Sequence, residues 1–425
     1  MLTFRVTNLS KLHRDILKSQ HLYIWYCLRL VELKKMSVSN LPVVISTGTA
    51  VCQDWITLLT AINNNDIDTV QMWLRTKDTS PNFVYDGQNP ICQAATAGFE
   101  DIVDLLLQYK CDPLQPDLSD HMWFRQPIHM AASKGHLEVV RRLVRRGVDI
   151  NSRDSDHRTP LHWVSTYGHL DLVEYLLSAG ACVNIAQIDG FTPMHAATCL
   201  GHDDVCKLLI ANGADVNRAD KDGWTALHTA VCYGYENVVE TLLDAGGSIH
   251  QTTNDDENCL HIAVSSGHID IVKMIYKRGV RSGEKNINGF TAFHLAVYYN
   301  KQTIAQFLIE KNVDMCTENY AKQTPLYLAA VRGEEQLLQM MLDGGYEVSR
   351  ENWLHYNTVP AAIKDTKIAE TLLYMAQNPR TLREITCLFL RRYLGDNIDQ
   401  LVHDLPLPSR LKELICFKAF DFEDG

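Results

Sequence analysis

Apolar residues recur along this chain in pairs of short segments with helical spacing, and polar turns separate the segments. Residues 158–184 show one complete unit. Gly168 and Gly180 interrupt it, and glycine often ends a helix because it adopts the left-handed conformation. Thr159 and Pro160 precede its first apolar segment, where threonine caps a helix and proline fits the first turn. The second segment has an apolar stripe on one helical face, formed by Leu170, Val173, Leu176 and Leu177. The pattern predicts two short helices per unit.

The unit returns about every 33 residues from residue 55 onward, and such periods indicate a repeat architecture. One unit cannot bury its apolar face alone, so neighbouring units must stack. The period and the T-P-L-H-x-A motif resemble the ankyrin repeat. The sequence therefore predicts an all-α ankyrin-repeat solenoid of about ten repeats. The positions equivalent to Pro160 are Thr57, Pro90, Pro127, Pro193, Ala226, Cys259, Ala292, Pro325 and Pro360.

Most of the 17 histidines fall in two columns of the repeat. Their periodic recurrence favours hydrogen bonds between turns and adjacent repeats over catalysis or metal binding. No nucleophile, zinc-protease or phosphate-loop motif stands out, so we expect no active site, metal or cofactor. One column follows the T-P-L position and the other follows the mid-repeat glycine: His129, His162, His195, His228, His261 and His294, then His136, His169, His202 and His268.

Charge and composition narrow the class of protein. A net charge of −11 argues against non-specific nucleic-acid binding. The twelve cysteines are scattered singly, as expected for reduced buried thiols. Residues 1–35 are basic and carry an apolar patch that is too short and too charged to span a membrane. We expect a cytoplasmic protein, with the nucleus as an alternative, and a flexible extension over residues 1–53 in which Met36 is an alternative start.

Target binding in an ankyrin stack usually uses the hairpin tips and the first-helix surfaces. The residues directly after the hairpin turn form one column: Arg158, Phe191, Trp224, Glu257, Phe290 and Gln323. Exposed aromatic residues there would anchor a partner, whereas the alternative is that they only cover the Thr-Pro turn beneath them. The neighbouring fingertip acids favour a basic partner segment: Asp154, Asp156, Asp189, Asp220, Asp222, Asp255 and Asp256.

Two other stretches differ from the repeat pattern. The insertion at residues 111–126 contains Met122, Trp123 and Phe124, which either bind a partner or fold back to seal the stack. The arginine-rich stretch 141–147 lies on a predicted second helix, where a solvated basic surface is expected.

The ankyrin resemblance also implies a modification. Asn151 and Asn217 each follow a leucine by eight residues and an aspartate by two. They resemble asparagines that are hydroxylated in other ankyrin proteins. The alternative is that they only cap the hairpin.

The tail predicts three short helices in about forty residues, which is too little chain to bury all its leucines internally. Gly395 ends the first predicted helix, and Pro406 and Pro408 impose an extended step before the third. Some apolar side chains must therefore pack on the repeat end or await another protein. A purely capping role is the alternative. The first helix carries its apolar residues at Leu382, Ile385, Phe389, Leu390 and Tyr393.

This tail resembles a SOCS box, and its position after the repeats resembles the ankyrin-repeat and SOCS-box family. The resemblance implies a substrate receptor that recruits elongin B and elongin C, together with cullin-five and its RING protein. Thr386 occupies a slot where the family has cysteine, with Cys387 one place along. The elongin-binding residues implied are Leu382, Ile385, Thr386, Cys387 and Leu390, and the cullin-binding residues are Leu405, Pro406, Leu407 and Pro408.

The predicted organisation is an extension (1–53), an ankyrin array (54–377), a SOCS box (378–417) and an acidic tail (418–425). In this prediction the array binds an unknown target protein, and the chain itself does no chemistry, binds no nucleic acid and contacts no membrane. The alternative is an ankyrin adaptor that binds one partner stoichiometrically without ubiquitination.

Overall fold

The computed structural model describes residues 50–76, 81–85, 87–117, 124–355 and 359–377. The predicted N-terminal extension up to residue 49, the SOCS box and the acidic tail lie outside these ranges. The chain divides into two compact units, Met1–Cys182 and Val183–Gly425. In both units the described secondary structure is a succession of short helix pairs, as the repeat period predicts.

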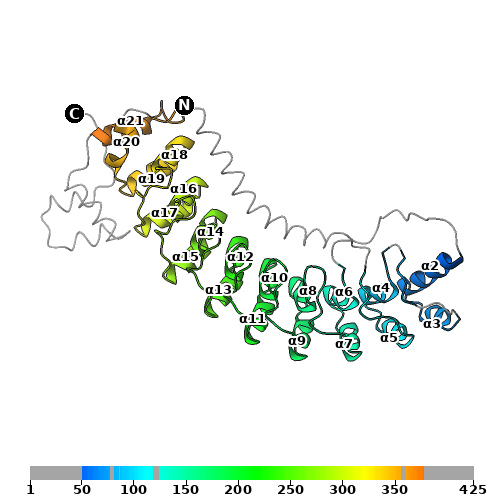
Figure 1. Ribbon diagram of the computed structural model, residues 1–425. Helices are drawn as coiled ribbons and strands as arrows, with labels where there is room; N and C mark the ends of the chain where they lie inside the picture. Colours follow the sequence, from blue (N-terminus) through cyan, green and yellow to red (C-terminus); the bar gives the residue numbers. More distant parts are fainter. Residues whose placement is uncertain (1–49, 77–80, 86, 118–123, 356–358, 378–425) are drawn as a thin grey trace. The chain divides into compact units, whose positions relative to one another are not determined.

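The first unit contains four helix pairs joined by hairpin turns (Figure 1). The first helices of successive pairs pack on one another, and so do the second helices. The pairs are α2 (Ala50–Asn63) with α3 (Ile67–Thr76), α4 (Pro90–Ala97) with α5 (Glu100–Gln108), α6 (Pro127–Lys134) with α7 (Leu137–Arg145), and α8 (Pro160–Tyr167) with α9 (Leu170–Ser178).

The second unit continues the pattern, with first and second helices in two separate rows (Figure 1). Its buried core is formed by the apolar stripes between these rows. The pairs are α10 (Pro193–Cys199) with α11 (Asp203–Ala211), α12 (Ala226–Tyr233) with α13 (Glu236–Asp244), α14 (Cys259–Ser266) with α15 (Ile269–Lys277), α16 (Ala292–Tyr298) with α17 (Gln302–Glu310), and α18 (Pro325–Arg332) with α19 (Glu335–Asp343).

The two terminal repeats depart from the predicted register. Pro360 was expected to begin a first helix, but the segment that follows it forms turns, closed by bonds such as Ile363 N–H to the Pro360 carbonyl at 3.1 Å. Among the described residues, the elements after α19 are η1 (Val348–Arg350), α20 (Asn352–His355) and α21 (Lys367–Gln377). At the other end, Thr57 stands where other repeats have the proline that marks a helix start, and it lies inside α2, which extends back to Ala50.

Buried histidines of the first column join their own helix start to the next repeat. In α12, Nδ1 of His228 accepts the backbone N–H of the N-cap residue Thr225 at 3.1 Å. Its Nε2 lies 3.0 Å from the carbonyl of Gln251, so Nε2 donates and the ring is the neutral Nε2–H tautomer. His195 and His261 make the same bonds to the carbonyls of Trp224 and Glu284. The structural interpretation of this column is confirmed for these residues.

The second histidine column connects each repeat back to the preceding one. Nε2 of His268 lies 3.2 Å from the carbonyl of Cys232, at the end of α12. The ring covers Gly234, which ends α12 at φ +78° and where an added Cβ would lie 2.5 Å from the ring. A side chain at this glycine is therefore excluded twice, by backbone conformation and by the histidine of the next repeat.

Burial of the first-column histidines predicts acid sensitivity. Desolvation lowers the pKa from 6.5 to about 4 in His129, His195, His228, His261 and His294. The unfolded chain binds these protons first as pH falls, so stability is complete above pH 6.5 and is lost toward pH 4.

We expect His228→Asn, which cannot titrate, to make the thermal midpoint fall less steeply than in the wild type between these pH values. The measurement is circular dichroism melting across the range. Buried acids such as Asp220 titrate in both proteins and cancel in the comparison. Equal pH slopes for the two proteins would contradict the assignment.

Candidate protein-interaction surface

The fingertip hairpins are held by a side chain at the start of each turn. In the tip before α12, Oδ1 of Asp220 accepts the backbone N–H groups of Asp222 at 2.9 Å and Trp224 at 2.8 Å. Burial raises the pKa of Asp220 to about 6. Neighbouring tips are also joined by backbone bonds, including Asn254 N–H to the Asp222 carbonyl at 3.0 Å. The tips of this unit therefore form a connected row rather than independent loops.

The predicted column of exposed anchors is mostly buried, which corrects the expectation for three of its members. Arg158 is 5% exposed, Phe191 6% and Phe290 2%. The two phenylalanine rings pack on histidines of their own repeats, with centroids 5.0 Å apart for Phe191–His195 and 5.7 Å for Phe290–His294. They therefore cover the helix start beneath them. Trp224 remains partly exposed, and Trp123 lies outside the described residues.

Arg158 is buried because it stacks on an aromatic ring. Its guanidinium carbon lies 5.1 Å from the ring centroid of Trp163, and that of Arg125 lies at the same distance. The indole N–H of Trp163 donates to Oδ2 of Asp154 at 3.0 Å. This cluster connects the fingertip to α8, so the described contacts of Arg158 are within its own chain.

A set of tyrosines at the ends of first helices was not identified from the sequence. Tyr167, Tyr233 and Tyr299 occupy one repeat position and are each partly exposed. Tyr233 stacks on Tyr235 at 6.0 Å, and Tyr299 meets Tyr298 edge-on at 5.1 Å. Their recurrence at one repeat position, at the end of the first helix, is the sequence pattern from which they could have been predicted. Tyrosine anchors interfaces well because it combines a large ring with a polar tip.

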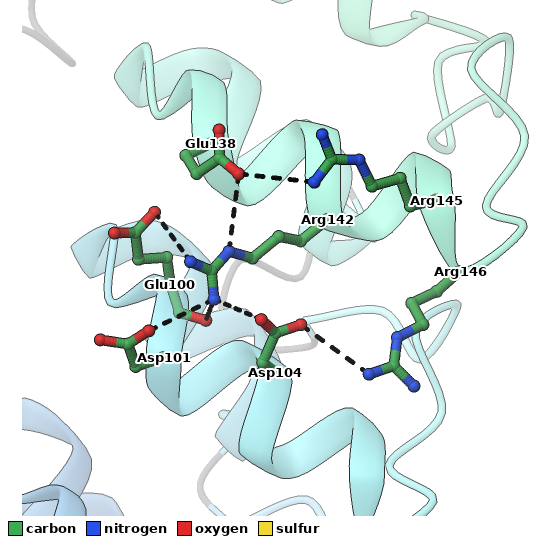
Figure 2. Close-up of polar contacts among 7 residues, drawn as sticks. All are labelled: Glu100, Asp101, Asp104, Glu138, Arg142, Arg145 and Arg146. Atoms are coloured by element: carbon green, nitrogen blue, oxygen red, sulfur yellow. Dashed lines mark hydrogen bonds and ion pairs between the residues drawn. The ribbon is translucent and has the colours of Figure 1, made fainter.

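The basic stretch 141–147 is solvated as expected at Arg145 and Arg146, whose side chains are 70% and 43% exposed, but not at Arg142. Figure 2 shows Arg142 of α7 pointing into a group of carboxylates from α5 and from its own helix. Its side chain is only 20% exposed. Its guanidinium group contacts the carboxylate of Asp104. The nearest guanidinium nitrogens lie 3.3 Å from a carboxylate oxygen of Asp101, 3.4 Å from one of Glu100 and 3.7 Å from one of Glu138. Arg142 thus joins two adjacent repeats.

Both asparagines considered for hydroxylation hold a hairpin of the repeat that follows. Oδ1 of Asn151 accepts the N–H of Cys182 at 2.8 Å. Oδ1 of Asn217 accepts the N–H of Ser248 at 2.8 Å, and its Nδ2 donates to the carbonyl of Gly246 at 3.0 Å. The capping role is therefore present, and hydroxylation of either residue stays a prediction.

The insertion between α5 and α6 is described only at its ends. Its first part is anchored, because Nδ2 of Asn89 donates to the carbonyl of Pro116 at 2.9 Å. The N–H of Asp117 also donates to the carbonyl of Arg125 at 2.8 Å. Phe124 is 47% exposed at φ +37°. Of the three residues expected either to bind a partner or to seal the stack, Phe124 lies at the surface, and Met122 and Trp123 lie outside the described residues.

Comparison with known families matches the two modules separately. The model described as "Ankyrin repeats (3 copies)" matches residues 114–187, 184–254, 210–286 and 260–352. An "Ankyrin repeat" model matches 86–118, and a "SOCS box" model matches 378–415. The ankyrin matches span more than half of the chain. The chain belongs to the ankyrin-repeat and SOCS-box family. The search of curated proteins returned no match.

Membership of the family gives the general role of the chain. An ankyrin array followed by a SOCS box is a substrate-receptor adaptor for elongin–cullin ubiquitin ligases, and such modules are typically non-catalytic. Among the described residues, no group of three or more His, Cys, Asp or Glu is placed to hold a metal ion. Within the same ranges, no helix has the length and apolar character needed to cross a membrane. The residues predicted to bind elongin and cullin lie outside the described residues.

The cluster of carboxylates around Arg142 predicts that removing the arginine lowers the free energy of unfolding. Arg142→Ala leaves Glu100, Asp101 and Asp104 close together without their shared cation, so we expect a loss of about 1–3 kcal/mol. The measurement is urea unfolding at low salt, and the loss should shrink in 1 M NaCl because exposed charges are screened there.

Arg145→Ala is the matched control in the same helix. Arg145 is 70% exposed with a single contact to Glu138 at 3.9 Å, so the expected change is within about 0.5 kcal/mol. If both substitutions changed the free energy of unfolding equally, the cluster of carboxylates around Arg142 would have no special role in stability.

Proposed function

We propose that this chain is the substrate receptor of a ubiquitin ligase that contains elongin B, elongin C, cullin-five and its RING protein. The observation that carries the proposal is the order of its modules, with the ankyrin matches ending at residue 352 and the SOCS box match covering 378–415. The matched box includes the Leu-Pro-Leu-Pro step at 405–408. In the family this step implies cullin-five rather than cullin-two.

The division of labour in this proposal follows the two modules. The array, residues 54–377, holds a target protein, and the SOCS box, residues 378–417, holds the ligase. In this proposal the chain supplies no reactive group. It accelerates transfer by holding lysines of the target near the charged ubiquitin carrier. We place the complex in the cytoplasm, with the nucleus as the alternative.

The cullin assignment predicts a selective loss. With the full chain and elongins B and C, pull-down should recover cullin-five, and changing both Pro406 and Pro408 to alanine should remove cullin-five while elongin C stays. Removing the prolines frees φ at both positions, so the extended step loses its rigidity. Leu382→Asp should remove both partners, since a charge is placed in an apolar contact. Glu423→Lys, in the acidic tail, is the control and should change neither. Recovery of cullin-two instead of cullin-five, or of no cullin, would sink the assignment.

Thr386 gives a second test of the SOCS box. Its hydroxyl is more polar than the cysteine thiol expected in the same slot, and burying it without a partner costs free energy. Thr386→Cys should therefore tighten elongin C binding by about tenfold or less, as measured by calorimetry. Cys387→Ser is the neighbouring control. Weaker binding of the Thr386→Cys chain would show that the slot has been assigned to the wrong residue.

A further inference from the structure

Glu257 occupies an unusual place in the fingertip row of the second unit. The equivalent residue is Trp224 in the preceding repeat and Phe290 in the following one. Its backbone is held like theirs, since the carbonyl of Glu257 accepts the N–H of Thr253 at 3.0 Å. A carboxylate thus stands where both neighbouring repeats carry an aromatic ring, at the base of a hairpin that the fold positions firmly.

The carboxylate of Glu257 is partly buried and held by an amide whose orientation is settled. Nδ2 of Asn286 donates to Oε1 of Glu257 at 3.2 Å. Oδ1 of Asn286 is occupied by the backbone N–H groups of Asn288 at 3.1 Å and Phe290 at 2.9 Å. The amide therefore has to present its nitrogen to Glu257, and one carboxylate oxygen is fixed in direction.

Within the described ranges, no lysine or arginine forms an ion pair with Glu257, and cations from neighbouring elements have other contacts. Nζ of Lys285 donates to the carbonyl of Glu318 at 2.8 Å. The guanidinium carbon of Arg332 lies 5.3 Å from the ring centroid of Tyr298. Burial and the nearby Asp255 raise the pKa of Glu257 to about 7. A partly buried carboxylate without a cation is costly, and the cost falls when a cation arrives.

A chain of contacts links this carboxylate to aromatic rings. Asn286, which holds Glu257, also accepts the backbone N–H of Phe290 at 2.9 Å. Burial, and then the negative charge of Glu257, raise the pKa of Tyr299. Tyr299 meets Tyr298 at 5.1 Å, and Tyr298 lies 5.8 Å from Phe290. A carboxylate with aromatic rings beside it is the usual arrangement for receiving a guanidinium or an ammonium group.

We propose that Glu257, with Tyr299 beside it, receives a lysine or arginine side chain of the target protein. This inference rests on the proposed function, in which the repeats hold a target, and it names one chemical requirement of that target. The basic side chain forms a charge-assisted hydrogen bond with the carboxylate and lies against the tyrosine ring. The acidic fingertip residue Asp255 adds to the attraction.

The test uses the full chain in complex with elongins B and C and a phage-displayed library of random twelve-residue peptides. Wild-type protein should select peptides with one recurrent basic position. Glu257→Gln should lose that preference, and Glu257→Arg should replace it with an acidic one. Glu240→Arg is the matched charge reversal, at an exposed site on α13, and should select like the wild type. Circular dichroism melting checks that Glu257→Gln is as stable as the wild type.

A selected peptide then gives the quantitative test. Replacing its basic residue with norleucine, or Glu257 with Gln, should each raise Kd about tenfold, and the two changes together should add little more. Fully multiplicative effects, or a basic preference that survives Glu257→Gln, would overturn the proposal, as would a wild-type selection with no basic position. Elongin C and cullin-five recovery is measured on the same preparations. Loss of cullin-five with peptide selection intact would reject the proposed function alone.

Discussion

The hydrogen bond from a buried histidine to the carbonyl of the next repeat is the interaction on which the array depends. In α12 the ring of His228 accepts from Thr225 and donates to Gln251, so one side chain caps a helix and attaches the following hairpin. It can do both only as the neutral Nε2–H tautomer. The fold is therefore coupled to the protonation of several equivalent side chains, and stacking of repeats replaces a single central core.

This constraint explains why so few polar residues are available for chemistry. Histidines such as His228 are bonded to backbone groups, and the fingertip acids Asp154 and Asp220 accept backbone N–H groups of their own turns. Arg142 is committed as well, to carboxylates of the adjacent repeat. Polar side chains in this array mostly join repeats, and the surface left for a partner is provided by the departures from the pattern.

Glu257 and the tyrosines are such departures. At positions where other repeats carry Phe191 or Phe290 against a histidine ring, Glu257 instead places a carboxylate, which Asn286 holds. The backbone turn is the same whether this position holds a buried ring or a carboxylate. Recognition of a target can therefore change from one such protein to another while the frame stays the same.

The sequence by itself determined the repeat period, the helix pairs and the histidine bonds, because these follow from local capping, glycine stops and a spacing of 33 residues. It also identified the tail through the Leu-Pro-Leu-Pro step. At Pro360, where a first-helix start was expected, the segment has neither the capping histidine nor the mid-repeat glycine, whereas the repeats of α4 and α18 lack only the histidine. Exposure of the fingertip column could not be predicted either. Whether Phe191, Arg158 or Glu257 faces a partner depends on which rings and amides of adjacent elements pack against it, and only the tertiary structure decides that packing.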